Sequence, residues 1–136
     1  MKNLFVIVLP LLVALAAQAQ PHEADYVRSW CDARGGISEF QMADKTRADC
    51  YLNDFVAEFD FGGKWAECIG QAQHYAAILH RESVPRRPLC VLIQRERTSD
   101  KQFARYSARA HSAAAAAGVV VRCLLPDGQP RICPLW

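Results

Sequence analysis

Six cysteines constrain the fold of this chain more than any other feature of its sequence. An even number of cysteines in a small exported chain is typical of a disulfide framework. A zinc site would be the competing use, but no two of them show the close spacing, with partnering histidines, that zinc ligands have. We therefore expect three disulfides, although spacing alone leaves their pairing open. The six are Cys31, Cys50, Cys68, Cys90, Cys123 and Cys133.

The N-terminal segment predicts export. It begins with a positive charge at Lys2, continues with an apolar stretch interrupted by Pro10, and ends at Ala17-Gln18-Ala19, a small-x-small cleavage pattern. The apolar stretch is too short and broken to span a bilayer stably. We expect residues 1–19 to be a signal peptide and the mature protein to be periplasmic or secreted by a bacterium, with no stable membrane insertion. An uncleaved N-terminal anchor is the alternative.

Residues 20–136 are enough for one modest domain and no more. The 16 Lys and Arg residues of the whole chain fall to 15 without Lys2, against 14 Asp and Glu residues. A nearly neutral domain does not bind nucleic acid by net charge alone. Any such binding would need a local site.

Hydrophobic periodicity predicts a mixed order of helices and strands. A first helix is ended by Gly35-Gly36, a three-strand meander follows, and two further strands are each reached through a long helix. This order predicts a single α/β domain in which the strand beginning at Leu89 lies beside a meander strand. The expected helices span residues 23–34, 64–80 and 99–117, and the expected strands span residues 36–42, 46–52, 55–61, 89–94 and 119–125.

Three carboxylates stand out in the meander. Strand alternation puts Asp49 opposite its apolar neighbours, and it puts Glu58 and Asp60 together on one face. If the two strands are neighbours, the carboxylates converge and repel one another unless a cation binds. Mg²⁺ or Mn²⁺ holding a water for attack on phosphorus is the usual solution. We predict Asp49 and Glu58 as metal ligands and Asp60 as a third ligand or water-positioning residue.

The helix after the meander carries three polar residues with a shared face. Lys64, Gln71 and Tyr75 are seven and four residues apart, with Cys68 between them. Lys64 would stabilise developing charge, while Gln71 and Tyr75 would position phosphate or backbone by hydrogen bonds. The plainer alternative is that these residues are solvated, and that Glu58 and Asp60 form ion pairs with arginines of the first helix, Arg28 or Arg34.

The order of these motifs resembles the PD-(D/E)XK nuclease superfamily. Its pattern is an Asp on one strand, a Glu-x-Lys on the next and then a helix, which in several branches carries Gln-x-x-x-Tyr. Asp49, Glu58 and Gln71 to Tyr75 match that pattern over roughly residues 35–93. The resemblance implies a restriction-endonuclease-like fold. The chain departs from the pattern at Asp60, which stands in the place of the lysine, and Lys64 would replace that lysine from the helix.

The chain also resembles a group of small exported proteins of unknown function. The shared segments are Trp30-Cys31, Gly35-Gly36, Arg47 to Cys50, Glu58 to Phe61, Lys64 to Glu67 and Ile69 to Gln71. Because Cys31 and Cys50 both belong to these segments, we predict that they pair. We further predict that Cys68 pairs with Cys90, tying helix to strand, and that Cys123 pairs with Cys133, holding the C-terminal tail.

Two functions follow from these residues. The first is a metal-dependent phosphodiesterase acting on nucleic acid. The second is a catalytically inactive nuclease-fold protein of the cell envelope that binds a protein partner, for instance in a secretion, conjugation or toxin-neutralising system. The two differ in whether Asp49 and Glu58 share an ion and whether Lys64 faces them.

Overall fold

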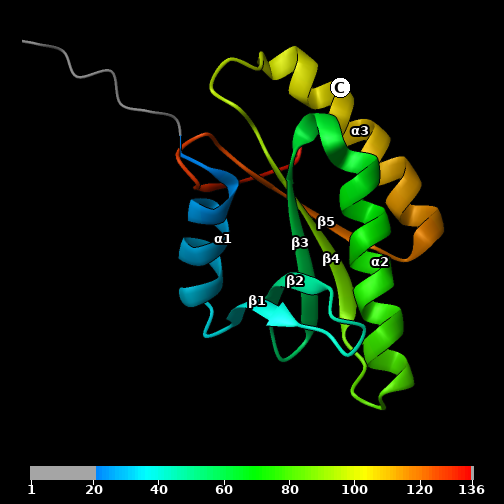
Figure 1. Ribbon diagram of the computed structural model, residues 1–136. Coiled ribbons are helices and arrows are strands. Elements are labelled where there is room, and N and C mark those ends of the chain that lie inside the picture. The colour runs from blue at the N-terminus through cyan, green and yellow to red at the C-terminus, as the bar shows by residue number, and fades with distance from the viewer. Residues whose placement is uncertain (1–20, 136) are drawn as a thin grey trace, which may run out of the picture.

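The strands of the sheet lie in space in the order in which they occur in the sequence, β1-β2-β3-β4-β5-β6. The computed structural model describes residues 21–135, and the predicted signal peptide, residues 1–19, lies outside them. In chain order the elements are α1 (Glu23–Asp32), β1 (Ile37–Gln41), β2 (Arg47–Tyr51), β3 (Phe55–Phe61), the short 3₁₀ helix η1 (Gly62–Lys64), α2 (Trp65–Arg81), β4 (Arg87–Ile93), α3 (Asp100–Ala117), β5 (Val120–Leu124) and β6 (Pro130–Arg131) (Figure 1).

The sheet is mixed. The first three strands form an antiparallel meander, β3, β4 and β5 are parallel, and β6 returns antiparallel to β5. Helices α2 and α3 are the crossovers between the parallel strands, as such strands require. The predicted α/β order and the predicted neighbourhood of the Leu89 strand are confirmed. The short strand β6 was not predicted, because Pro130 and Arg131 carry no strand signal.

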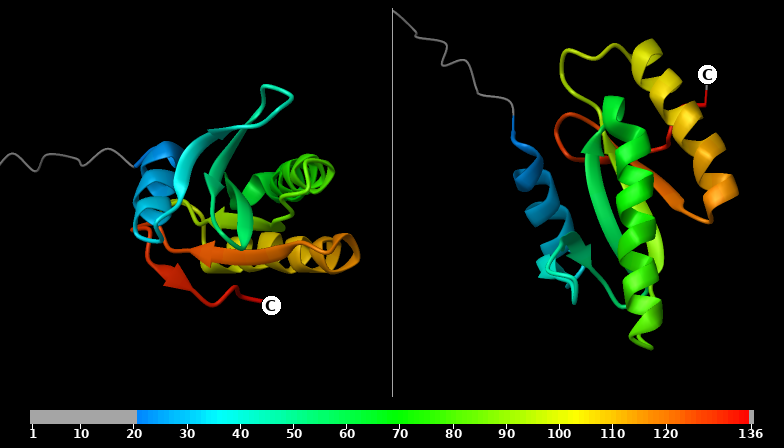
Figure 2. Two further views of the ribbon diagram at one scale, coloured as in Figure 1. Left: turned by 90° about the horizontal axis from the view of Figure 1, so that it is seen from below. Right: turned by 45° about the vertical axis from the view of Figure 1, so that its right-hand side comes forward.

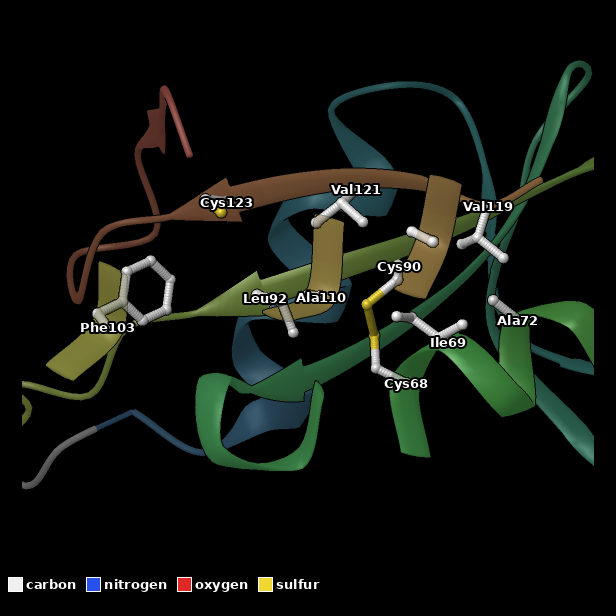
Figure 3. Close-up of a cluster of buried hydrophobic side chains, with 11 residues drawn as sticks. Cys68, Ile69, Ala72, Cys90, Leu92, Phe103, Ala110, Val119, Val121 and Cys123 are labelled. Atoms are coloured by element: carbon white, nitrogen blue, oxygen red, sulfur yellow. A yellow bond between two sulfur atoms is a disulfide. The ribbon is translucent and has the colours of Figure 1, made fainter. Parts of the chain in front are cut away.

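The helices cover the two faces of the sheet unequally. Figures 1 and 2 show α1 on one side and both α2 and α3 on the other. On the α2 and α3 side, Cys90 and Leu92 of β4 pack against Ile69 and Phe103 (Figure 3). On the α1 side, the core contains Val27, Ala57, Phe59, Leu89 and Val91 among others. Residues of β4 therefore enter both cores, which explains its continuous apolar sequence.

All three predicted disulfides are present: Cys31 with Cys50, Cys68 with Cys90, and Cys123 with Cys133. They fit a protein of an oxidising, extracytoplasmic compartment. The first leaves no space beside Gly36, where a Cβ atom would lie 2.7 Å from the Cys31 sulfur and 2.8 Å from the Cys50 sulfur. Among residues 21–135, no helix is both long and apolar enough to cross a membrane.

One expectation for α2 needs correction. The helical spacing of its apolar residues predicts that Trp65, Ile69, Ala72, Ala76 and Leu79 form the buried stripe of this helix, with Tyr75 on the neighbouring polar stripe. In the structure Tyr75 is itself buried, and Trp65 and Ala76 are only half-buried. The reason is that the β1–β2 hairpin packs on the C-terminal half of α2, where Met42 and Ala48 join Tyr75 in one cluster. Helical periodicity cannot anticipate a second contact of this kind.

Candidate functional site

The site begins where β2 separates from β3. The pairing of the two strands comprises Cys50 with Ala57 and Tyr51 with Val56. Beyond that point, the Asp49 carboxylate takes the place of a strand partner and accepts a hydrogen bond of 2.7 Å from the backbone N–H of Phe59. The meander thereby brings Asp49 next to the segment of β3 that carries Glu58.

Glu58 lies at the centre of the site. Its side chain is on the α2 face of β3, since its neighbours Ala57 and Phe59 face α1. Only 7% of the residue is exposed, and its Oε2 atom has no hydrogen-bond partner, although side-chain hydrogen bonding of the carboxyl with Asp49 and Tyr75 contributes to the pKa of all three groups. Buried polar atoms nearly always have a partner in folded proteins, so an orphaned carboxylate oxygen calls for an explanation.

Tyr75 and Gln71 close the site from α2. The Tyr75 hydroxyl donates a hydrogen bond of 3.2 Å to the Gln71 side-chain carbonyl. Burial and the nearby Glu58 and Asp49 carboxylates raise the pKa of Tyr75, which therefore stays neutral. The Gln-x-x-x-Tyr pair predicted from the sequence thus forms one hydrogen-bonded unit beside Glu58.

Asp60 lies further along β3, at the N-terminal end of α1. It is 4% exposed, and Glu23, in the first turn of α1, is its close acidic neighbour. Two cations approach this end of the site. Lys64 lowers the pKa of both Asp60 and Glu23, and Arg95, whose guanidinium stacks 3.7 Å from the centre of the Phe61 ring, lowers that of Glu23.

The four carboxyls, hereafter the acidic row, are Glu23, Asp49, Glu58 and Asp60. Burial is the largest cause that raises the pKa of each, and repulsion from the neighbouring acids adds to it for Asp49, Glu58 and Asp60, whereas a hydrogen bond with Asp60 lowers the pKa of Glu23. The pKa of Asp60 is raised to about 7. In Asp49 the hydrogen bond from Phe59 opposes the rise. The row therefore holds protons that ordinary carboxyls release, unless a cation replaces them.

The structure brings together most of the residues that the sequence singled out. Asp49, Glu58 and Asp60 lie in one row, with Tyr75 and Gln71 beside Glu58. Lys64 is exposed and acts on Asp60 and Glu23.

Sequence reasoning missed Glu23, because a first-turn acid is an ordinary helix feature. It also missed the backbone of Glu39, whose φ of +53° lies in the left-handed region, opposite Asp49 on β1.

The plainer alternative, ion pairs with the first helix, does not form within the described part of the chain. No ion pair there joins Glu58 or Asp60 to Arg28 or Arg34. Arg34 instead lies over the Trp30 ring, 3.9 Å from its centre. The charges of Glu58 and Asp60 therefore have no arginine partner from α1.

Within residues 21–135, no group of three or more His, Cys, Asp and Glu side chains is arranged so that it could hold a metal ion. A site for Mg²⁺ does not require such a group, because this ion is usually bound through one or two carboxylates, with waters and substrate phosphates completing its shell.

Comparisons with models of protein families, with curated proteins and with solved structures found no match to this chain. The assignment of a function therefore depends on the site itself.

Proposed function

We propose that the protein is an exported, metal-dependent phosphodiesterase that acts on nucleic acid. The observation that carries the proposal is the buried Glu58 carboxyl, whose Oε2 atom lacks a partner while Asp49 lies beside it. Two neighbouring buried carboxyls without a cation destabilise the fold. Binding of a cation by the pair would remove this destabilisation and would explain why both carboxyls are buried.

The donor set fits a hard divalent cation. Asp49 and Glu58 would hold Mg²⁺ or Mn²⁺ through their oxygens, and the orphaned Oε2 atom of Glu58 is the free donor that such an ion needs. When bound, the ion would neutralise the two carboxylates and lower the pKa of a coordinated water. We therefore expect that, without substrate, binding of the ion makes both carboxyls release their protons near neutral pH.

The remaining residues have separate parts in the proposal. Asp60 would accept a proton from a water or orient it, since its pKa of about 7 suits proton transfer near neutral pH. Lys64 would bind the phosphate backbone at the Glu23 end of the row. Gln71 and Tyr75 would hold the Glu58 side chain in place and shield it from solvent.

The architecture supports the same proposal. The order of one helix, a three-strand meander, a helix and a strand is the one that the PD-(D/E)XK resemblance implies, and the acidic row lies on the first helix, α1, and on the meander strands β2 and β3. We propose a restriction-endonuclease-like fold on this basis.

The test uses the mature, disulfide-intact chain. Plasmid DNA, single-stranded DNA and RNA are incubated with Mg²⁺ or Mn²⁺, with EDTA as the blank. We expect cleavage that needs the metal, and we expect Asp49→Asn and Glu58→Gln each to abolish it, because each removes a ligand charge while keeping the side-chain size. Asp54→Asn, an exposed acid just before β3, is the matched control and should retain activity.

A direct measurement of metal binding distinguishes a site that binds no metal from an assay that lacks the right substrate. Titration calorimetry with Mn²⁺ should show one site per chain that Glu58→Gln removes and Asp54→Asn does not. If the wild-type chain binds no divalent metal and cleaves none of the three substrates, the proposal fails.

One observation favours a second function. Lys64 lies in η1 and acts on Asp60 and Glu23, whereas the lysine of the nuclease pattern belongs on β3, two residues after Glu58. A catalytically inactive nuclease-fold protein that binds an envelope partner would explain this placement. It predicts metal binding without cleavage, and retention of wild-type partner binding when Glu58 is replaced by Gln.

A further inference from the structure

The α1 face of the sheet carries a hollow whose lining is apolar and basic, unlike that of the acidic row. Helix α1 packs on Phe59 and Phe61, through Trp30 and Tyr26, and leaves the other end of the parallel strands uncovered. A hollow of about 330 Å³ lies there between α1, the strands β3 to β5 and the short strand β6. Its volume is at the small end of the range for ligand pockets.

The hollow has an apolar floor and apolar walls. Leu89 and Leu124 are buried at its base, and Trp30, Leu52 and Phe55 are half-buried along its sides. Because β3, β4 and β5 are hydrogen-bonded to each other along this region, the floor offers no backbone donor or acceptor. A ligand in contact with the floor must therefore be apolar.

The rim, in contrast, is basic. Arg34, Arg122 and Arg131 line the hollow, and no acidic residue does. Arg131 is already engaged, since its guanidinium hydrogen-bonds to the Gln94 side chain. The exposed Arg34 and Arg122 donate only to the backbone carbonyls of Trp30 and Val121, so their other N–H groups can bind a ligand. Hereafter we call this hollow the arginine groove.

Two kinds of macromolecule fit the arginine groove poorly. Bases of nucleic acid need open aromatic faces for stacking, but Arg34 lies 3.9 Å from the ring centre of Trp30, and Arg87 lies 5.0 Å from that of Phe55. A peptide in extended conformation needs a free sheet edge, and the groove lies on the face of paired strands.

We propose that the arginine groove binds a single-chain amphiphile with an anionic head, such as a fatty acid. The acyl chain would lie on Leu52, Leu89 and Leu124, and the carboxylate would accept hydrogen bonds from Arg122 and Arg34. The proposal rests on charge complementarity between a basic rim free of acids and an anionic head, and on the volume and apolar floor of the groove.

The test is titration calorimetry of the mature, oxidised chain with dodecanoate below its micellar concentration. We expect one bound molecule per chain. Acetate has the carboxylate without the long acyl tail, and dodecyltrimethylammonium has the tail with a positive head. Each should bind at least about tenfold more weakly than dodecanoate. Equal binding of acetate, or of the cationic amphiphile, overturns the proposal. Preferential binding of an oligonucleotide or of an acidic peptide overturns it as well.

Variants locate the site. Arg122→Glu reverses the charge of one rim residue and should weaken dodecanoate binding about tenfold or more. Arg109→Glu makes the same change on the exposed side of α3 and should leave binding unchanged. Circular dichroism and the mass of the three-disulfide form show that both variants fold. Equal loss in the two variants, or no loss in Arg122→Glu, overturns the proposal.

This inference does not depend on the proposed nuclease function. Glu58 lies on the α2 face of β3, whereas Phe55 and Leu89 of the groove lie on the α1 side. Glu58→Gln should therefore abolish metal binding and leave dodecanoate binding intact, so that failure of either proposal is recognised separately.

Discussion

The two faces of β3 are built from alternating residues of one short strand, yet they differ completely in chemistry. On the α1 face, Ala57 and Phe59 are fully buried in an apolar core. The centres of the Trp30 and Phe59 rings are 5.3 Å apart. On the α2 face, Glu58 and Asp60 are buried almost as deeply, but without an arginine or lysine paired to Glu58.

The two faces have opposite effects on stability. Burying an aromatic ring stabilises the folded state, whereas burying an unpaired carboxyl opposes folding. Proteins retain destabilising groups where a function requires them. The contrast within β3 is therefore what the proposed function would explain, and substitutions on the two faces test it, from the largest expected effect to the smallest.

The largest effect should come from the apolar face. Phe59→Ala removes a ring that is 0% exposed, and it should lower the free energy of unfolding by about 3–5 kcal/mol. Urea denaturation of the oxidised mature chain measures this. Phe61→Ala, at a half-buried position on the same face, is the matched variant and should cost less. Equal costs would mean that the full burial of Phe59 does not set the cost of removing a ring from the α1 face.

The acidic face should respond in the opposite direction, through pH. The pKa of Asp60 is raised to about 7, above its value of about 4 in the unfolded chain. Between these values the folded state binds the proton that the unfolded state releases, so stability falls as pH rises from about 4 to 7. In EDTA, the free energy of unfolding should be roughly 2–3 kcal/mol lower at pH 8 than at pH 5 from Asp60 alone.

Substitutions assign this slope to the acidic row. Asp60→Asn and Glu58→Gln should each flatten the pH dependence and stabilise the chain at pH 8, while Asp54→Asn should change neither. Mg²⁺ should stabilise the wild-type chain at pH 8 by mass action, and it should not stabilise Glu58→Gln. Stability that rises between pH 5 and pH 8 in EDTA would contradict the burial of uncompensated carboxyls.

The smallest effect concerns the backbone next to the acidic row. Glu39 has a φ of +53° and raises the pKa of Asp49 from the neighbouring strand. Glycine adopts this φ without strain, so Glu39→Gly should raise the free energy of unfolding by less than about 1 kcal/mol. Glu39→Ala keeps the backbone strain and should not raise the free energy of unfolding. Loss of the Glu39 ion pair with Arg47 should change stability little, because the pair is exposed and its N–O distance is 3.9 Å. Equal gains in the two variants would show that charge, not backbone strain, is relieved.

Much of the fold was predictable from local pattern. The strand at residues 55–61 was predicted with the bounds that the structure has, and the helix of residues 99–117 begins at its capping Ser99 and ends at Gly118 in the left-handed conformation. The first disulfide was predicted because Cys31 and Cys50 both belong to the segments shared with small exported proteins, and the other two because they would tie a helix to a strand and hold the C-terminal tail. Burial of Tyr75 and pairing of β6 were not predicted, because both depend on segments remote in sequence.

The candidate site divides in the same way. Alternation along two strands predicted that Asp49, Glu58 and Asp60 would share a region, since side-chain direction is a local property of a strand. The addition of Glu23 and the action of Lys64 on Asp60 and Glu23 depend on how α1 and η1 meet β3.

By itself, the sequence determined the order and type of the elements other than β6, the presence of a disulfide framework and the three carboxyls of the meander, because these follow from periodicity, cysteine number and motif. Only the tertiary structure decided that β2 separates from β3 at Asp49, that Glu58 is buried with an oxygen unpaired, and that α1 leaves an arginine-rimmed groove. The physical reason is that burial and charge pairing are properties of surfaces brought together in space. The same residues in an isolated strand would simply be solvated.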